Sequence, residues 1–296
     1  MGIEKRNGKL WFSEELYKDI SYGFEVSEIL VPEKKTKFQK LMILKTPRFG
    51  KVLILDGVVQ LTEKDEKIYH EFMAHWPLFS QKNPKTVLIV GGGDGGVARE
   101  VLRHKNIKKV YLVDIDSEVI ETVKKYIPTI FQNAFSDPRL EIHCEDAVRF
   151  IKKIKKASLD AVILDSSDPI GPARSLFGSS FIQDVHKILR DGGIIIRQTG
   201  SIIFQEHEFR ESYKQIEKVF STENTRTVLI SPASYFGGYF SLVAAIKGRK
   251  NFQQMINGAE KRYKKSGIKT DWYSGDLHRN LTILPPLINT MLRKQR

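Results

Sequence analysis

The chain has 296 residues, of which 41% are hydrophobic and 28% charged, and its formal net charge is +13. These proportions are ordinary for a globular protein, and the length suffices for one large α/β domain with a smaller one beside it. The sequence shows no apolar run of the roughly 18 residues that span a bilayer and no secretory signal, and its single cysteine, Cys144, excludes an intrachain disulfide or a cysteine-rich metal site. We therefore expect a cytoplasmic protein.

The N-terminal part of the chain favours short strands. Residues 41–44 and 51–55 are apolar or alternating runs bounded by turn signals. In the stretch 63–79, aromatic and apolar residues recur at helical spacing. We predict a small β-rich N-terminal domain over residues 1–80, with its boundary in the polar segment 81–84.

From residue 85 onward, apolar strands alternate with helical patterns. This alternation is typical of a mostly parallel, doubly wound sheet with helices on both faces. The last two strands follow each other closely, which predicts an antiparallel hairpin. We therefore predict an α/β domain over residues 81–296 with seven strands, at residues 86–90, 109–114, 140–143, 159–164, 193–197, 227–230 and 239–246.

A glycine-rich loop, GGGDGG at residues 91–96, joins the first of these strands to a helix. Such a loop presents backbone N–H groups and the positive end of a helix at the sheet edge, although glycines also form ordinary tight turns. The next strand ends at Asp114, whose carboxylate is suited to accept hydrogen bonds from both ribose hydroxyls of a nucleoside. Because Gly91, Gly93 and Gly96 also match the spacing of dinucleotide-binding loops, an NAD-dependent dehydrogenase stays an alternative.

Two further acidic motifs follow later strands. Glu145 and Asp146 come after the third strand, where Asp146 is suited to bind an adenine amino group, although a helix N-cap is the more common role for such a residue. The motif DSSDP at residues 165–169 follows the fourth strand, at the edge where open α/β sheets bind their ligands. The same motif also favours a simple turn built on aspartate side chains.

Six segments together resemble the spermidine synthase family. The similarity extends from about residue 11 to residue 285, and the order and spacing of GGGDGG and DSSDP are its most specific features. The resemblance implies a methyltransferase-like (Rossmann-like) catalytic sheet, preceded by a small N-terminal domain that takes part in oligomerisation and covers the acceptor pocket. The segments are LDGVVQLTEKD at 55–65, IYHE at 68–71, VGGGDGG at 90–96, LDSSDPIGPARSLF at 164–177, YFGG at 235–238 and WYSGDLH at 272–278.

The resemblance also implies the reaction. Spermidine synthases transfer the aminopropyl group of decarboxylated S-adenosylmethionine to putrescine, which gives spermidine and 5′-methylthioadenosine, and they use neither a metal nor a prosthetic group. We expect a homodimer or homotetramer that binds a small diamine, with no nucleic acid or membrane partner.

Positions that match the family carry the implied site residues. The residues implied to bind the sulfonium nucleoside are Gln39, Gly91, Gly93, Asp94, Asp114, Glu145, Asp146 and Pro172. The residues implied to bind the amine are His70, Asp94, Asp165, Asp168, Gln198 and Tyr235. Asp165 is the implied proton acceptor, and Asp168 and Tyr69 complete the catalytic group.

Elementary chemistry favours aminopropyl transfer over methyl transfer. S-adenosylmethionine carries an α-carboxylate, and the carboxylate of Asp94 beside it costs several kcal/mol at low effective dielectric. Asp94 should therefore favour the decarboxylated substrate. A diamine is doubly protonated near neutral pH, because alkyl ammonium groups titrate near pH ~10. The attacking nitrogen must first lose a proton, and Asp165 is suited to accept it.

The identity of the acceptor stays open. The C-terminal motif has Trp272 and Ser274–Gly275 where relatives show tyrosine and asparagine, and residues 231–234 (SPAS) replace a shorter run before Tyr235. Cadaverine, agmatine or spermidine is therefore an alternative acceptor to putrescine. An S-adenosylmethionine-dependent methyltransferase is a more distant alternative.

The basic net charge has two interpretations. Lysines and arginines are scattered without a basic stripe, which favours a solvated surface over a nucleic-acid-binding protein. A protein with a charge of +13 does not attract a polyamine through its overall field. Carboxylates of the site must then attract it within a Debye length of about 8 Å. We predict an acidic cleft in a basic surface.

Overall fold

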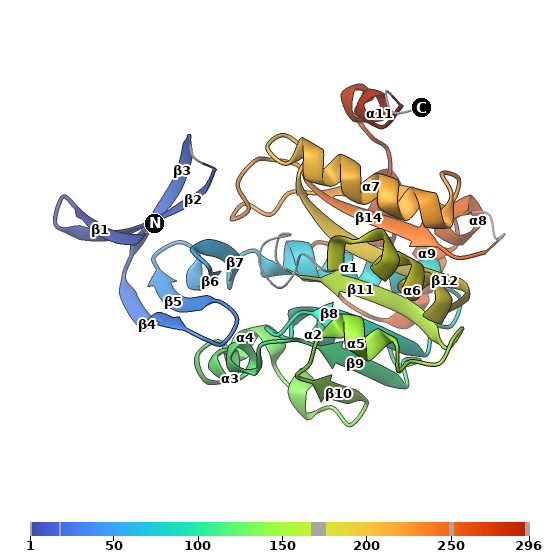
Figure 1. The fold of residues 1–296 in the computed structure, drawn as a ribbon, viewed down its shortest axis with the longest axis horizontal. Coiled ribbons are helices and arrows are strands. Elements are labelled where there is room, and N and C mark those ends of the chain that lie inside the picture. The colour runs from blue at the N-terminus through green and yellow to red at the C-terminus, as the bar shows by residue number, and fades with distance from the viewer. Residues whose placement is uncertain (1, 18, 167–175, 249–251, 294–296) are drawn as a thin grey trace.

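The computed structural model describes residues 2–17, 19–166, 176–248 and 252–293. The N-terminal strands lie at one end of the molecule and the large sheet with its helices at the other (Figure 1). Within these residues, none of the helices combines the length and the apolar character needed to cross a bilayer.

Two antiparallel sheets form the N-terminal part. The first contains β1 (Gly2–Arg6), β2 (Lys9–Tyr17) and β3 (Ile20–Val26). The second contains β4 (Glu28–Lys35), β5 (Lys40–Thr46), β6 (Gly50–Leu55) and β7 (Val58–Thr62).

Strand β5 shows how the second sheet is held on both faces. Leu41 and Ile43 are buried in one cluster with side chains of helix α3 (Ser117–Tyr126), whereas Met42 and Leu44 are buried in another with side chains of β2 and β3. The two-residue period of a strand sends alternate side chains to opposite faces. The second sheet is therefore packed between the first sheet and the large domain.

A seven-stranded sheet forms the centre of the large domain, as the sequence predicts. Its order is β10-β9-β8-β11-β12-β14-β13. Strand β14 is antiparallel to both of its neighbours, and the other pairs are parallel. The bounds are β8 (Thr86–Gly91), β9 (Lys109–Val113), β10 (Leu140–His143), β11 (Leu159–Asp165), β12 (Leu189–Ser201), β13 (Thr225–Ile230) and β14 (Phe240–Ile246).

Helices cover both faces of this sheet, so the fold is the doubly wound α/β fold that was predicted. One buried cluster joins the sheet to α1, α2, α8 and α9, and the other joins it to α5, α6, α7 and α11. The bounds are α1 (Glu66–Ser80), α2 (Gly96–Leu102), α4 (Pro128–Phe131), a 3₁₀ turn (Ala134–Ser136), α5 (Ala147–Ile151), α6 (Ser179–Ile188), α7 (Glu206–Phe220), α8 (Phe252–Ile256), α9 (Ala259–Ser266), α10 (Gly275–Asn280) and α11 (Pro286–Arg293).

Helix α1 lies inside the segment 1–80 that we predict as the N-terminal domain. Its buried side chains, among them Phe72 and Trp76, belong to the same cluster as Val87 and Ile89 of the large sheet. The division into residues 1–80 and 81–296 stays a prediction, and the packing of α1 favours a boundary just before that helix.

Candidate active site

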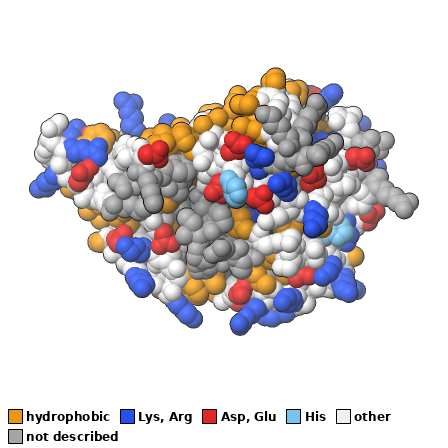
Figure 2. Space-filling view, turned by 45° about the horizontal axis from the view of Figure 1, so that its top comes forward, with side chains coloured by type: hydrophobic (Ala, Val, Ile, Leu, Met, Phe, Trp, Pro, Cys, Tyr) orange, Lys and Arg blue, Asp and Glu red, His pale blue; other side chains and the backbone are white. Residues whose placement is uncertain are grey.

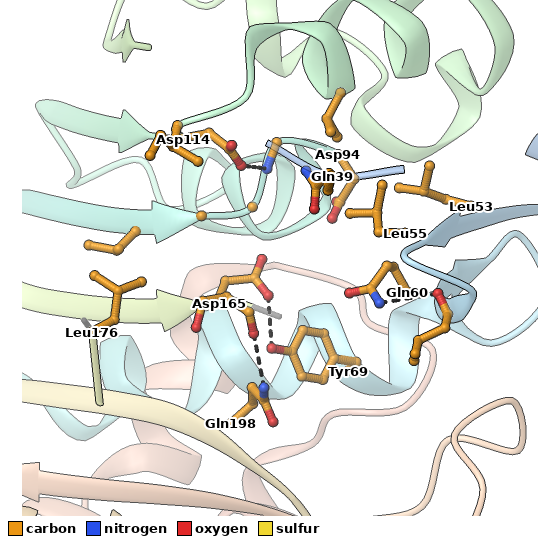
Figure 3. Close-up of a pocket in the computed structure, with 18 of the residues that line it drawn as sticks. Gln39, Leu53, Leu55, Gln60, Tyr69, Asp94, Asp114, Asp165, Leu176 and Gln198 are labelled. Carbon is orange, nitrogen blue, oxygen red and sulfur yellow. Dashed lines mark hydrogen bonds between the residues drawn. The ribbon is translucent and has the colours of Figure 1, made fainter. Parts of the chain in front are cut away.

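A pocket lies where the connections of the large sheet reverse direction, between β8 and β11. These strands are parallel neighbours, and Gly91 at the end of β8 lies opposite Asp165 at the end of β11. Open α/β sheets bind their ligands outside the carboxyl ends of strands at such a reversal. Figure 3 shows Asp114 and Asp165 on the side of the pocket formed by the strand ends of the large sheet. Leu53 and Gln60 of the second N-terminal sheet lie on the opposite side.

The structure brings the predicted site residues together in this pocket, although their roles stay predictions. Asp168 and Pro172 lie outside the described residues. The predicted residues that line the pocket are Gln39, Tyr69, His70, Gly91, Gly93, Asp94, Asp114, Glu145, Asp146, Asp165, Gln198 and Tyr235.

Two glycines of the loop 91–96 allow a carbonyl group and a side chain to approach its backbone closely. A Cβ atom on Gly91 would lie 2.1 Å from the carbonyl oxygen of Asp165, and Gly91 has a φ of +79° that residues with side chains rarely adopt. A Cβ atom on Gly96 would lie 2.2 Å from Nδ1 of His70. Glycine at these positions is therefore required by the close approach of Asp165 and His70.

Asp114 directly follows β9 and is fixed by backbone groups. Its Oδ2 accepts a hydrogen bond from the N–H of Gly93 at 3.0 Å, and its Oδ1 accepts one from the N–H of Asp116 at 2.9 Å. Burial raises the pKa of Asp114 to about 6 despite these bonds. The carboxylate is thus held at the strand end, where it can face the hydroxyl groups of a sugar.

The other residues that we predict to bind the nucleoside also have partners within the protein. The Nε2 of Gln39 donates to Oδ2 of Asp116 at 2.9 Å. Asp146 is the N-cap of α5, since its Oδ1 accepts from the N–H of Val148 at 2.8 Å, so the capping alternative is confirmed for a residue that also lines the pocket. Glu145 forms an ion pair with Lys153 at 2.6 Å.

The two carboxylate oxygens of Asp165 differ in their hydrogen bonding. The hydroxyl of Tyr69 donates to its Oδ1 at 2.8 Å (Figure 3), whereas its buried Oδ2 has no hydrogen-bond partner among the described residues. Burial and the nearby charge of Asp94 raise the pKa of Asp165 to about 7, although the charge of His70 and the bond from Tyr69 oppose this. Asp165 is therefore poised to exchange a proton near neutral pH.

Amide and aromatic groups surround the space beside Asp165. The Nε2 of Gln198 donates to the carbonyl oxygen of Ser166 at 2.9 Å. The hydroxyl of Tyr235 donates to the carbonyl oxygen of Gln60 at 2.5 Å, and its ring meets that of Tyr69 edge-on at 5.8 Å between centroids. These rings suit the alkyl chain of an amine, and the polar groups suit its charged end.

Glu14 of β2 is a pocket residue that sequence reasoning missed. Its side chain is buried, and its Oε2 accepts from the backbone N–H of Val59 at 2.6 Å. The alternating pattern around it carries no sign of chemistry, and the family resemblance assigned no residue there. Gln60 and Ser234 were missed for the same reason, and Ser234 belongs to the unusual segment 231–234.

The donor atoms of His70, Asp94 and Asp165 lie within 4.8 Å of one another, which is close enough to surround a metal ion. A neutral imidazole nitrogen with a free lone pair would be needed to bind the ion. Both ring nitrogens of His70 instead face carboxylate oxygens, those of Glu66 and Asp94. This arrangement fits a hydrogen-bonded charge cluster better than a metal centre.

The charge of the lining agrees with the predicted acidic cleft. Among the described residues, no lysine or arginine lines the pocket. On the face seen in Figure 2, lysine and arginine side chains are spread around the molecule and do not gather in one patch. The carboxylates that line the pocket are those of Glu14, Asp94, Asp114, Glu145, Asp146 and Asp165.

Comparison with solved structures gives close matches over the whole fold. A spermidine synthase in complex with the transition state analogue AdoDATO superposes with a TM-score of 0.91 at 31% identity, covering 99% of this chain and 98% of that one. The spermidine synthase from Thermotoga maritima superposes with a TM-score of 0.89 at 31% identity, covering 99% and 97%.

Comparison by sequence divides the chain in two. Residues 10–63 match the spermidine synthase tetramerisation domain, and residues 66–254 match the spermine/spermidine synthase domain. A polyamine aminopropyltransferase of Thermoanaerobacter sp. strain X514 is 40% identical over 280 residues, covering 95% of this chain and 97% of the relative. Polyamine aminopropyltransferase 1 of Pseudomonas aeruginosa is 34% identical over 284 residues, covering 96% and 98%. Since both domain matches and these full-length similarities agree, the chain belongs to the spermine/spermidine synthase family of polyamine aminopropyltransferases.

Proposed function

We propose that the chain transfers the aminopropyl group of decarboxylated S-adenosylmethionine to putrescine, giving spermidine and 5′-methylthioadenosine. The observation that carries this proposal is Asp165, a half-buried aspartate whose buried Oδ2 has no hydrogen-bond partner among the described residues and which shares a pocket with the glycine loop. The solved spermidine synthase in complex with the transition state analogue AdoDATO supports the assignment.

The nucleoside half of the pocket would hold the sulfonium substrate. Asp114 would accept hydrogen bonds from the ribose hydroxyls, and Asp146 from the adenine amino group. Asp94 would face the ammonium end of the aminopropyl group, where the α-carboxylate of S-adenosylmethionine would be repelled. The proposed reaction uses neither a metal ion nor a prosthetic group.

The reaction would then be an in-line displacement. The ammonium of the acceptor gives a proton to Asp165, which leaves a neutral amine with a lone pair. This nitrogen attacks the aminopropyl carbon bonded to sulfur, the carbon–sulfur bond breaks, and its electron pair stays on sulfur as a neutral thioether. The positive charge passes from the sulfonium to the new secondary ammonium, so charge is conserved.

Putrescine suits the pocket because the lining offers a carboxylate for each end of a diamine. Asp165 would take the reacting nitrogen, and Glu14, which comes from the N-terminal sheets, would pair with the second ammonium. Tyr69, Tyr235 and Phe240 would line the alkyl chain between them. In this arrangement the N-terminal unit closes the acceptor end. We also assign to that unit the formation of a homodimer or homotetramer, which the match to a tetramerisation domain supports.

One assay tests this function. The purified protein is incubated with decarboxylated S-adenosylmethionine and, separately, with putrescine, cadaverine, agmatine and spermidine, and the products are identified by mass. We expect 5′-methylthioadenosine and spermidine with putrescine as the preferred acceptor, undiminished by a chelator. Absence of 5′-methylthioadenosine with every amine would overturn aminopropyl transfer. Faster turnover of another amine would correct the acceptor alone.

A further inference from the structure

His70 lies between two carboxylates inside the pocket. Its Nδ1 is 2.5 Å from Oε2 of Glu66, one helical turn earlier on α1, and its Nε2 is 3.4 Å from Oδ1 of Asp94. Because an ionised carboxylate oxygen only accepts hydrogen bonds, the Nδ1 that is bonded to Glu66 must carry a hydrogen. Asp94 lies at ion-pair distance from Nε2, where its carboxylate favours a second hydrogen and a positive charge on the ring. The ring is 2% exposed, and water therefore has little part in this arrangement.

Glu66 is itself held in place by Arg99 of α2. The Nη1 of Arg99 donates to Oε1 of Glu66 at 3.0 Å, and its Nη2 donates to Oε2 at 2.9 Å. Such a paired contact fixes the plane of the carboxylate and favours its ionised form. Burial acts to raise the pKa of Glu66, but His70 and Arg99 together lower it.

We propose that Glu66 is a positioning residue that keeps His70 doubly protonated, so that an imidazolium cation faces Asp94 and Asp165. Arg99 acts one step further away by fixing Glu66. The aminopropyltransferase site would thus contain a cation of its own, the ring of His70, maintained by Glu66, which does not line the pocket. The effect of Glu66 on turnover rests on the proposed function, whereas its effect on the charge of His70 does not.

The cation would favour the ionised form of the proton acceptor. Burial acts to lower the pKa of His70, but Asp94 and Glu66 raise it to about 9. The other groups that face the ring are Asp165 and Tyr69, and burial holds the pKa of Tyr69 well above 10, so that it stays neutral. Because the charge of His70 lowers the pKa of Asp165, loss of that charge should raise it above its value of about 7.

The test compares Glu66→Gln with wild type in two measurements. Gln can still accept from Nδ1 but carries no charge. In the free protein with ¹⁵N-labelled histidine, we expect both ring nitrogens of wild-type His70 to be protonated at neutral pH and to titrate near pH 9. The signal is assigned by its loss in His70→Gln. In Glu66→Gln the titration should move down by at least about one pH unit.

The second measurement is the pH profile of kcat/KM. Asp165 must be ionised to accept a proton, so kcat/KM rises as pH passes its pKa. In Glu66→Gln this rise should move to higher pH. At neutral pH, kcat/KM should then fall about tenfold for each pH unit by which the rise moves, and it should recover near the upper end of the range.

The control is Glu100→Gln. Glu100 is equally buried and accepts from Nε of Arg99 at 2.8 Å, but its other partners are His75 and Arg103. Glu100→Gln should leave both the titration of His70 and the pH profile of kcat/KM unchanged. Equal shifts in the two variants would reduce Glu66 to a structural role and overturn the proposal. A wild-type ring with one unprotonated nitrogen at neutral pH would overturn it as well, even if Glu66→Gln did not fold or the protein had no activity.

Discussion

Asp165 owes its chemistry to its surroundings more than to its residue type. An exposed aspartate is a weak base near neutral pH, because its pKa lies near 3.9. Burial and the charge of Asp94 raise the pKa of Asp165 to about 7, while Tyr69 binds one oxygen and the other has no hydrogen-bond partner among the described residues. A pKa near neutral pH suits the role of proton acceptor that we propose for Asp165.

Replacement of Asp165 should separate binding from turnover. We expect Asp165→Asn to lose about 10²–10⁴-fold in kcat, the usual contribution of a general base. It should bind 5′-methylthioadenosine as wild type does, because the residues that we propose to hold the nucleoside, among them Asp114, are unchanged. Calorimetry and steady-state kinetics measure the two quantities. Tyr69→Phe, which removes only the bond to Oδ1, should lose less, and near-normal turnover of Asp165→Asn would assign the base elsewhere.

Asp94 should set the preference for a decarboxylated nucleoside. Its Oδ1 accepts from the N–H of Gly96 at 2.7 Å, so the carboxylate is fixed inside the loop. We expect Asp94→Asn to reduce the preference for decarboxylated over intact S-adenosylmethionine by at least about tenfold, because a like-charge contact is removed. Competition binding with both nucleosides measures this ratio. Glu145→Gln is the control, and an unchanged ratio in Asp94→Asn would remove Asp94 from selection.

At the scale of elements, helix α1 connects the site to the C-terminal segment. Tyr69 and His70 line the pocket, whereas Glu71 points to the segment after α9. Its Oε1 accepts from the N–H of Asp271, and its Oε2 accepts from the N–H groups of Trp272 and Tyr273, at 2.8–2.9 Å. The motif WYSGDLH therefore anchors α1 and does not line the pocket among the described residues.

Loss of this anchor should destabilise the protein. Glu71 is 1% exposed, so Glu71→Gln places an amide group against buried N–H donors. We expect the free energy of unfolding to fall by about 2 kcal/mol or more, measured by urea unfolding at one protein concentration. Lys67→Ala is a matched control, since Lys67 pairs with Asp271 at 2.6 Å between the same two elements but is exposed, and it should cost less than about 1 kcal/mol. Equal losses would contradict an anchoring role for Glu71.

The sequence predicts the parts of the site that stand at strand ends. Asp114 and Asp165 follow strands with clear apolar patterns, and the loop 91–96 joins a strand to a helix, so their convergence at one sheet edge follows from topology. Glu14 and Glu66 could not be found in this way. Glu14 reaches the pocket only because the N-terminal sheets pack on the large domain, and Glu66 looks like an ordinary acidic residue in the first turn of a helix.

For the whole molecule, the pocket and the surface carry opposite charges. The chain has a net charge of +13, yet among the described residues six carboxylates and no lysine or arginine line the pocket. A diamine cation is therefore repelled at long range and attracted at contact. Both parts of the chain contribute to the attraction, because Glu14 comes from the N-terminal sheets and the other carboxylates come from the large domain.

This separation of charges predicts an unusual response to salt. Salt screens interactions beyond a Debye length of about 8 Å at physiological ionic strength, so it weakens the long-range repulsion more than the contacts inside the pocket. We expect kcat/KM for putrescine to stay constant or rise between about 0.05 and 0.3 M sodium chloride. Steady-state kinetics at fixed pH and saturating nucleoside measure it. A fall of tenfold or more would mean that an acidic field around the pocket mouth attracts the amine from a distance, despite the net charge of the chain.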